Sequence, residues 1–306
     1  MIIRSFLILL SMSFTLHSEE NFGIVVHGGA GVMSGLSEKA QQEIHKNIQE
    51  TVSKAYAILE GGGSSLDAVE HAVSMLEDSP LFNAGRGSVY NSDEVQEMDA
   101  SIMDGKNRLT GAIASVSIIK NPIKLARKVA EETKHVLLVG EGAERFAKDV
   151  GVEIVDKDYF HHEERYQRVL NSKKQISKSM QSSDKIGTVG AVALDRNGNI
   201  AAATSTGGMT NKMPGRVGDS PIIGSGTWAQ NGVCGVSSTG HGEFFIKYQV
   251  AREVCVRIEY LNQTLSDSAE SIISELNALE AKGGLIAIDH MGKISTPFNT
   301  KGMIRG

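Results

Sequence analysis

Apolar and polar positions along the chain follow two different periods. A helical period is clear over residues 37–59, where one apolar face is formed by Ala40, Ile44, Ile48, Val52, Ala55 and Leu59. Gly61 follows this predicted helix, and a second helix is predicted over 65–77, ahead of Ser79-Pro80. The apolar run 22–27 ends at Gly28-Gly29-Ala30-Gly31, which predicts a buried strand that enters a tight turn.

Strand patterns dominate the middle of the chain. Residues 98–103 and 109–119 predict two strands joined by a turn, and the Asn197-Gly198 pair predicts a hairpin between strands 188–194 and 200–204. The other predicted elements are a helix that begins at Pro122, a strand over 136–139, a helix over 141–150, helices over 242–261 and 265–279, and a hairpin over 284–294. Antiparallel strands with helices on both sides favour an α+β fold in which two central sheets lie between helices.

One segment in the middle lacks an apolar period. Residues 156–186 are rich in Lys, Ser, Gln, Glu and His, which is the composition of a mobile linker. No new domain is needed after it, so the chain is interpreted as one domain.

The first residues resemble a targeting segment. Arg4 precedes an apolar run from Ser5 to Leu16, which is shorter than the roughly 20 residues that a membrane-spanning helix needs. We interpret residues 1–18 as a signal peptide cleaved before Glu19, and we expect an exported protein, periplasmic or secreted. The alternative is an apolar extension ahead of the first strand.

Composition excludes some classes of partner. The chain has 306 residues, 41% of them hydrophobic and 22% charged, which is ordinary for a globular domain. A net charge of −5 gives no broad positive field, so neither nucleic acid nor, once the leader is removed, a membrane is an expected partner. Cys234 and Cys255 are too few for a disulfide framework; they are expected to be buried small residues, and a single bridge stays open in an oxidising compartment.

Several common sites are absent from the sequence. It contains no G-x-S-x-G, no G-x-x-x-x-G-K-[ST], no G-x-G-x-x-G, no H-E-x-x-H and no C-x-x-C. What remains is a concentration of small hydroxyl and glycine residues at 187–190, 204–211, 215–220 and 237–242. Glycines let backbone N–H groups surround a small ligand, although the same composition is typical of ordinary turns.

At these residues the sequence resembles the isoaspartyl peptidase/plant-type L-asparaginase branch of the N-terminal nucleophile hydrolases. The resemblance extends from about Ile24 to the C-terminus and is carried by His27-Gly28-Gly29-Ala30-Gly31 and by residues 80–85, 99–105, 187–195 and 204–220. It implies a four-layer αββα sandwich that is cleaved before Thr188. The expected products are an α chain, 19–187, and a β chain, 188–306, which stay together in a heterotetramer of two α and two β chains.

Thr188 suits the role of nucleophile that the resemblance implies. Its hydroxyl is weak and needs a base. Cleavage of the Gly187-Thr188 bond exposes an α-amino group with a pKa of about 7.7–8.0, so roughly a tenth of it is neutral at pH 7. Gly187 has no side chain, which allows a strained geometry at the bond. Without the resemblance, Thr188 is an ordinary β-branched residue at the start of a strand.

The resemblance also assigns roles to other positions. Thr206 hydrogen-bonds the nucleophile, and Thr239 with the N–H of Gly240 forms the oxyanion hole. The guanidinium of Arg216 binds the substrate α-carboxylate, for which its planar fork is suited, and Asp219 accepts the substrate α-amino group. The remaining assignments are an active-site asparagine, Asn83, a substrate-contacting glycine, Gly242, and a structural sodium turn of main-chain carbonyls at Leu76, Glu77, Ser79, Phe82, Ala84 and Arg86.

The expected activity is hydrolysis of small substrates without a catalytic cofactor. L-Asparagine would give aspartate and ammonia, and β-aspartyl dipeptides would be cleaved, through an ester on Thr188. Two alternatives remain open: a glycosylasparaginase-like amidase, which shares the leader but differs around the nucleophile, and an exported amino-acid-binding protein without turnover. His241 stands where some relatives carry threonine, and it is expected to line the turn.

Overall fold

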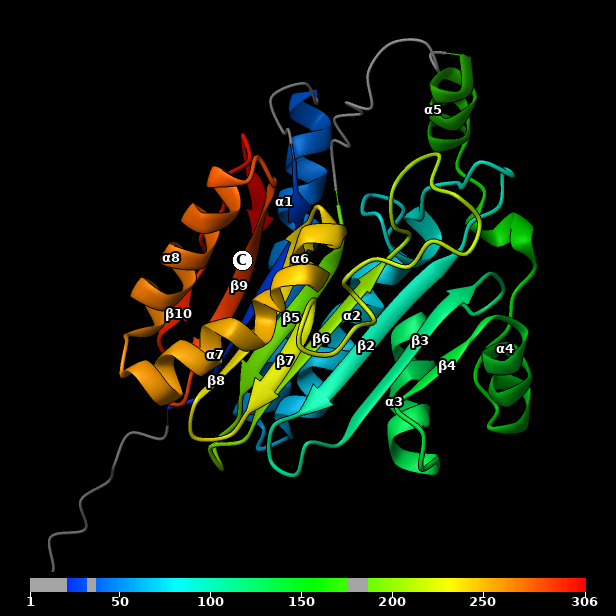
Figure 1. Ribbon diagram of the computed structural model, residues 1–306. Coiled ribbons are helices and arrows are strands. Elements are labelled where there is room, and N and C mark those ends of the chain that lie inside the picture. Colours follow the sequence, from blue (N-terminus) through cyan, green and yellow to red (C-terminus); the bar gives the residue numbers. More distant parts are fainter. Residues whose placement is uncertain (1–20, 32–36, 175–186) are drawn as a thin grey trace, which may run out of the picture.

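The computed structural model describes residues 21–31, 37–174 and 187–306 (Figure 1). The predicted signal peptide, 1–18, and the last part of the predicted linker, 175–186, lie outside the described residues. The described chain mixes helices and sheets, which confirms the α+β class. None of its helices is long and apolar enough to cross a membrane.

The helices agree with the sequence predictions at most positions. They are α1 (Glu38–Glu60), α2 (Ser65–Asp78), α3 (Pro122–Glu132), α4 (Gly140–Asp149), α5 (Glu163–Lys174), α6 (Gly242–Tyr248), α7 (Val250–Leu261) and α8 (Leu265–Ala278), with short 3-10 helices η1 (Gly85–Gly87) and η2 (Lys157–Phe160). The helix predicted over 242–261 is split into α6 and α7 by Gln249, which has a left-handed backbone with φ of 50°.

Side-chain caps explain where several helices begin. Ser37 accepts from the backbone N–H of Ala40, and Ser64 and Thr264 do the same for the third residue beyond them. Proline at the first position starts α3, because its missing N–H would have no helical partner there.

The strands form two sheets. They are β1 (Gly23–Ala30), β2 (Met98–Asp104), β3 (Thr110–Val116), β4 (Leu137–Val139), β5 (Val189–Leu194), β6 (Ile200–Thr206), β7 (Thr227–Gln230), β8 (Cys234–Gly240), β9 (Gly283–Asp289), β10 (Ile294–Ser295) and β11 (Met303–Arg305). The seven-stranded sheet has the order β11-β1-β5-β6-β2-β3-β4 and is antiparallel except for the β3–β4 pair. The four-stranded sheet has the order β10-β9-β8-β7 and is antiparallel.

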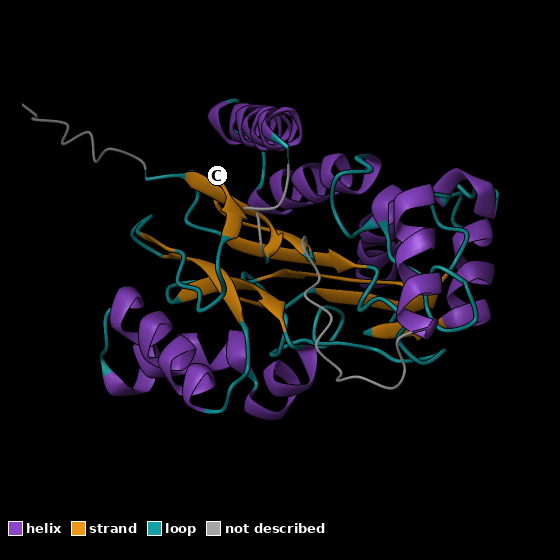
Figure 2. Ribbon diagram, turned by 90° about the horizontal axis from the view of Figure 1, so that it is seen from above, coloured by secondary structure: helices purple, strands orange, loops and turns teal. Residues whose placement is uncertain are grey.

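Strand alternation divides the apolar residues between two clusters. Val26 and Ala191 belong to a cluster that joins the seven-stranded sheet to α1, α2, α3 and α4. Their neighbours Val25 and Val192 belong to a second cluster, which lies between the sheets and under α7 and α8. Helices accordingly appear on both sides of the strands in Figure 2. The site described below lies at one end of the space between the sheets.

Two sequence predictions need correction. The tight turn predicted at 28–31 is wrong, because β1 continues to Ala30 and pairs with β11 through a bulge between His27 and Gly29. Much of the predicted linker 156–186 is helical rather than irregular, since η2 and α5 occupy it. Only a few buried positions hold this part, among them Phe160 and Val169, so it lacks the full apolar face that a sequence pattern can reveal.

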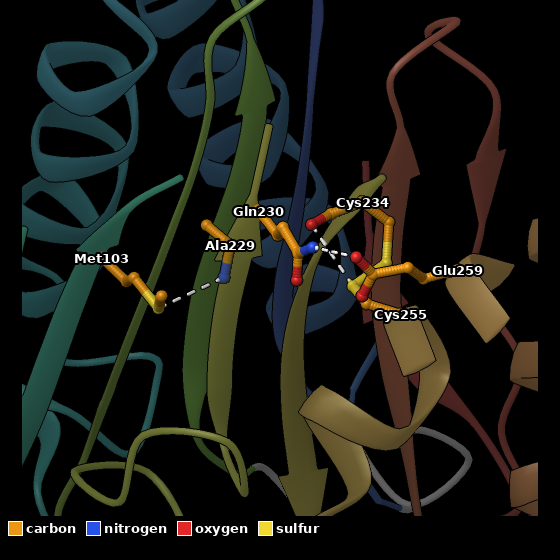
Figure 3. The surroundings of a disulfide bond; sticks show 6 residues. All are labelled: Met103, Ala229, Gln230, Cys234, Cys255 and Glu259. Atoms are coloured by element: carbon orange, nitrogen blue, oxygen red, sulfur yellow. Dashed lines mark hydrogen bonds between the residues drawn. A yellow bond between two sulfur atoms is a disulfide. The ribbon is translucent and has the colours of Figure 1, made fainter. Parts of the chain in front are cut away.

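The two cysteines are paired. Cys234 on β8 and Cys255 on α7 form a disulfide bond, with both residues buried (Figure 3). Next to it, the side-chain amide of Gln230 donates to Glu259 at 3.0 Å, a second link between the four-stranded sheet and α7. The bridge ties the strand that carries Thr239 to the helix that covers it.

Candidate active site

The antiparallel register collects polar residues in two rows on the inner face of the seven-stranded sheet. Residues opposite each other on antiparallel strands point to the same face. The first row, across β1, β5, β6 and β2, consists of His27, Gly190, Thr204 and Ser101. In the second row, Thr206 lies opposite Asp99, and Thr188 lies two residues before Gly190. The register alone thus places the predicted nucleophile next to Thr206.

Thr188 and Thr206 form a buried hydroxyl pair. Thr188 Oγ1 donates to Thr206 Oγ1 at 3.0 Å, and the backbone N–H of Gly208 donates to the same oxygen at 3.0 Å. The two threonines are 8% and 2% exposed. Because Thr206 Oγ1 accepts twice, its own hydrogen is free to point elsewhere, and the Thr188 hydroxyl is held in one direction.

The residue before the nucleophile is enclosed by backbone. A Cβ built on Gly29 would lie 2.6 Å from the Cα of Gly187, and Gly29 has φ of 103°, so this position requires glycine. On another side, Thr239 Oγ1 lies 3.1 Å from where a Cβ of Gly187 would be, and it accepts from the N–H of Ala30 at 3.3 Å. The predicted oxyanion residue Thr239 therefore lies beside the predicted cleavage bond. The next residue, Gly240, is exposed.

Asn83 acts on the backbone of the site. Its Nδ2 donates to the carbonyl of Gly208 at 2.7 Å, and its Oδ1 accepts from Val89 N–H at 3.0 Å. The Gly207 N–H donates to the Asn83 carbonyl at 3.0 Å. Asn83 thus positions the segment whose Gly208 N–H reaches Thr206. Its predicted place at the site agrees with this geometry, and a direct role stays a prediction.

Arg216 and Asp219 face a space left by glycines. A Cβ on Gly242 would lie 2.8 Å from Asp219 Oδ1 and 3.1 Å from Arg216 Nη2, and one on Gly218 would lie 2.8 Å from Arg216 Nη1. Asp219 is buried, and its Oδ2 has no hydrogen-bond partner among the described residues. Burial raises the pKa of Asp219 to about 7, with Arg216 acting to lower it. A buried carboxylate oxygen without a partner is suited to bind a cationic group such as an α-ammonium.

His27 is a residue of the site to which the sequence motifs assign no role. It is fully buried, and its Nε2 lies 3.0 Å from Ser237 Oγ. Burial lowers its pKa to about 3, against which an interaction with the Thr188 backbone acts to raise it, so the ring is neutral. Its position opposite Gly190, two residues after the nucleophile, could have been inferred only from the strand register.

A chain of buried hydroxyls continues from His27 across the two sheets. Ser237 Oγ lies 2.7 Å from Thr204 Oγ1, which accepts from Thr227 Oγ1 at 2.6 Å. Ser101 Oγ lies 2.8 Å from Thr227 Oγ1 and 2.6 Å from the carbonyl of Ser220, the residue after Asp219. Gly190 makes room for this chain, because a Cβ there would overlap Ser237 Oγ and lie 2.5 Å from His27 Nε2.

Two further buried ionisable residues, Lys212 and Asp99, lie near the predicted substrate-binding residues. Lys212 is 5% exposed and donates to the Glu97 carbonyl at 2.8 Å, while its Nζ lies 3.1 Å from where a Cβ of Gly208 would be. Burial lowers the pKa of Lys212 and raises that of Asp99, and each charge offsets the shift of the other. The burial of Lys212 does not show in the sequence, because a lysine in a glycine-rich stretch resembles a solvated loop residue.

The predicted sodium turn is a compact loop between α2 and η1. A Cβ on Gly87 would lie 2.8 Å from the carbonyl oxygen of Pro80, and the loop returns so that Gly85, with φ of 51°, packs against the Glu77 carbonyl. The Glu77 side chain is buried, accepts from Ser205 Oγ at 2.6 Å, and has a pKa raised by burial to about 8. Two of the predicted donors, the carbonyls of Leu76 and Ala84, accept backbone N–H groups of Ser79 and Gly87 at 3.4 and 3.1 Å, and the sodium ion stays a prediction.

His241 is the N-cap residue of α6. His241 Nδ1 accepts from the Lys282 N–H at 3.3 Å, so its ring lies against the turn as predicted. Across residues 21–31, 37–174 and 187–306, no group of three or more His, Cys, Asp or Glu side chains could hold a metal ion.

A buried pair of threonine hydroxyls, linked through Gly208 to an arginine near a buried carboxylate, fits the class of hydrolases that act on small polar substrates. Comparison with known proteins narrows this class. The family model described as asparaginase matches residues 20–306, so the chain belongs to the asparaginase family.

Three relatives illustrate the extent of the similarity. The chain is 46% identical to an isoaspartyl peptidase of Escherichia coli over 292 residues, which cover 92% of this chain and 91% of the relative. It is 44% identical to a putative isoaspartyl peptidase/L-asparaginase of Dictyostelium discoideum, with 92% of each chain covered. It is 45% identical to the isoaspartyl peptidase/L-asparaginase of Rattus norvegicus, with 88% of this chain and 80% of the relative covered. The similarity confirms the family resemblance noted in the sequence.

The space at Gly190 leads to a first prediction. Gly190→Ala should abolish cleavage of the chain and reduce activity by at least about 100-fold, because its Cβ must displace His27 or Ser237, a packing change that typically costs about 1–3 kcal/mol. Electrophoresis and thermal unfolding measure both effects. Gly142→Ala is the matched control: nothing lies within 4 Å of its Cβ, and alanine in α4 should be neutral or stabilising. Normal cleavage and activity of Gly190→Ala would contradict the proposed close fit.

The raised pKa of Asp219 leads to a second prediction. Only the ionised carboxylate attracts an α-ammonium group, so with a pKa of about 7 the affinity for L-aspartate should be about tenfold weaker at pH 6 than at pH 8. Inhibition constants measured across this range test the slope. Asp219→Asn should bind weakly and lose the slope, and a flat profile in the wild-type protein would remove Asp219 from the binding step.

Proposed function

We propose that the protein is an autoprocessed amidohydrolase that converts L-asparagine to aspartate and ammonia and hydrolyses β-aspartyl dipeptides. The observation that carries this proposal is the hydrogen bond between the hydroxyls of Thr188 and Thr206. Thr188 is the residue directly after Gly187. The names of the relatives, isoaspartyl peptidase and L-asparaginase, support the same substrates.

A chain of contacts connects the nucleophile to the substrate residues. Thr206 Oγ1 accepts from Gly208 N–H, and a Cβ on Gly208 would lie 3.3 Å from Arg216 Nη1. Gly242 in turn approaches both Arg216 and Asp219. A substrate held by its α-carboxylate and α-ammonium groups at these two side chains extends its side-chain amide toward Thr188.

The proposed cleavage of the precursor uses the nucleophile itself. The Thr188 hydroxyl attacks the Gly187 carbonyl, the peptide C–N bond breaks, and the chain is joined for a time by an ester. Water then hydrolyses the ester, leaving a carboxylate on Gly187 and a free α-amino group on Thr188. The tight enclosure of Gly187 by Gly29 and Thr239 supports a restrained carbonyl at this bond.

Substrate hydrolysis repeats this chemistry on an amide. The neutral α-amino group of Thr188 takes the hydroxyl proton while Oγ1 attacks the side-chain carbonyl, and Thr239 Oγ1 and the Gly240 N–H stabilise the oxyanion. The proton passes to the leaving nitrogen, which departs as ammonia or as the amino group of the released residue. Water then attacks the β-aspartyl ester and frees the Thr188 hydroxyl. No step needs a cofactor.

The arrangement of the elements supports a four-layer αββα sandwich of the N-terminal nucleophile hydrolase type. In this proposal α1, α2 and α3 form one outer layer and α7 and α8 the other.

The exposed apolar side chains of Val136, Leu137 and Val139 at the β4 edge support assembly into two α and two β chains, which light scattering of the cleaved protein would test.

Export is part of the same proposal. The composition of residues 1–18 favours a signal peptide, and the disulfide of Cys234 and Cys255 suits an oxidising periplasmic or extracellular space. N-terminal sequencing of the mature protein should find Glu19 first, and a retained Met1 in cell extracts would overturn the assignment.

A structural sodium ion is proposed for the loop of Leu76, Glu77, Ser79, Phe82, Ala84 and Arg86. It would hold this loop in shape and, through Asn83, the backbone of the site. Thermal unfolding in sodium against choline chloride tests it, because only a specific site gives a midpoint that rises with sodium at constant ionic strength.

The nucleophile assignment predicts the state of the chain. Wild-type protein should show two fragments under denaturing conditions, whereas Thr188→Ala should remain one uncut, inactive chain because it lacks the attacking oxygen. Thr188→Ser keeps the oxygen and should be cut, as a control for folding. Cutting of the Thr188→Ala protein would rule out the mechanism.

Substrate comparison separates the proposed activity from its alternatives. Ammonia release from asparagine and cleavage of a β-aspartyl dipeptide should both be seen. Preference for a glycosylated asparagine would instead indicate a glycosylasparaginase-like enzyme, and binding without turnover an amino-acid-binding protein.

A further inference from the structure

One carboxylate that is not among the predicted site residues contacts Arg216, the arginine predicted to bind the substrate. Arg216 Nε donates to Glu243 Oε1 at 2.9 Å, and Arg216 Nη2 lies 2.8 Å from the same oxygen. The arginine side chain is 16% exposed and that of Glu243 52%. Glu243 follows Gly242 in the first turn of α6, so the residue that approaches the substrate space and the residue that holds the arginine are adjacent.

This contact occupies one edge of the guanidinium group, and Glu243 does not occupy the other edge. A guanidinium can bind a carboxylate along either of two edges, Nε with one Nη, or the two Nη atoms together. Glu243 takes Nε and Nη2 with a single oxygen. The remaining edge has Nη1 near Gly218 and Nη2 near Gly242, two positions without side chains. Asp219 Oδ1 lies beside the same Gly242.

We propose that Glu243 is a positioning residue that holds the Nε side of Arg216, so that the Nη1–Nη2 edge is presented to the substrate α-carboxylate beside Asp219. This inference rests on the proposed function, because it concerns how that site selects substrates with a free α-carboxylate. Glu243 itself does not touch the reacting atoms.

The opposite role for Glu243 is that of a competitor. A carboxylate that filled the place of the substrate α-carboxylate would have to leave before binding, and its removal would tighten binding. The geometry favours positioning, because a single Glu243 oxygen contacts Nε and Nη2, which form a guanidinium edge other than the one proposed for the substrate. The two roles predict opposite changes in KM.

The charge of Glu243 gives a second, independent readout. Asp219 is buried, and the charged groups acting on it are Arg216 from its own loop, Glu243 from α6 and Asp99 from β2. The negative charge of Glu243 disfavours ionisation of Asp219, whereas Arg216 favours it, so neutralising Glu243 with Arg216 still in place, as in Glu243→Gln, should let Asp219 ionise at lower pH. The acid limb of kcat/KM should then move to lower pH, which loss of packing alone would not produce.

The experiment compares Glu243→Ala and Glu243→Gln with a matched control, Glu275→Gln. Glu275 pairs with Arg257 at 2.8 and 2.9 Å and is 55% exposed, but it lies on α8 away from the site. Glu243→Ala should raise KM for asparagine about tenfold, the loss of one charge-assisted contact, with kcat within about threefold. Glu243→Gln retains an oxygen toward Arg216, so its KM should rise less while the acid limb still moves. The control should change none of these.

A substrate without the α-carboxylate makes the test specific. The α-amide of L-asparagine cannot use the Arg216 fork, so the preference of the enzyme for asparagine over this amide should fall about tenfold in Glu243→Ala. Equal losses for both substrates, or a lower KM for asparagine, would overturn the proposal.

A binding measurement tests the role of Glu243 independently of the proposed enzymatic activity. Titration of the cleaved wild-type and Glu243→Ala proteins with L-aspartate and with its α-amide measures the same discrimination without turnover. A wild-type protein that hydrolyses neither asparagine nor a β-aspartyl dipeptide would refute the proposed function. The titration would still decide the role of Glu243, since an unchanged aspartate affinity in Glu243→Ala would refute it.

Discussion

The contact of His27 with Ser237 across Gly190 joins the two sheets directly behind the nucleophile. It exists because Gly190 has no side chain, which lets the imidazole of one sheet reach the hydroxyl of the other. The hydroxyl chain that starts there ends on the carbonyl of Ser220, next to Asp219. One continuous chain of polar side chains therefore connects the region behind Thr188 to the residue next to Asp219. Most of these side chains come from strands rather than loops.

The site concentrates ionisable groups that the protein itself does not satisfy. Asp219, Asp99 and Glu77 each keep a buried carboxylate oxygen without a hydrogen-bond partner among the described residues. Such groups cost stability, typically about 1–3 kcal/mol each, and they are tolerated where a ligand supplies the missing partner. For Asp219 the proposed partner is the α-ammonium group of the substrate. The neutral state of His27 adds no positive charge that would compete with it.

Local sequence identified the chemistry better than the architecture. The family resemblance carried by the glycine and hydroxyl stretches assigned roles to Thr188, Thr206, Arg216 and Asp219, and the structure brings these residues close to one another. The same composition concealed β8, because Ser237 and Thr239 occupy inner-face positions where an apolar residue would have revealed a strand. Gly28-Gly29 was interpreted as a turn, but Gly29 is required by its approach to Gly187, far along the chain. His27, Lys212 and Glu243 become visible only when register and packing bring separate segments together.

Cleavage and catalysis make different demands on the same backbone. Cleavage needs the Gly187 carbonyl held against the Thr188 hydroxyl, and the glycine at position 29 permits that approach. Catalysis needs the space that Gly187 leaves when the bond is cut, because the new α-amino group must reach the Thr188 hydroxyl and the substrate carbonyl must reach Thr239. Thr239 Oγ1 lies 3.1 Å from where a Cβ of Gly187 would be in the uncut chain, so under the proposed mechanism the precursor itself fills the space beside the oxyanion residue. In that mechanism, self-cleavage both creates the base and vacates the place proposed for the substrate carbonyl.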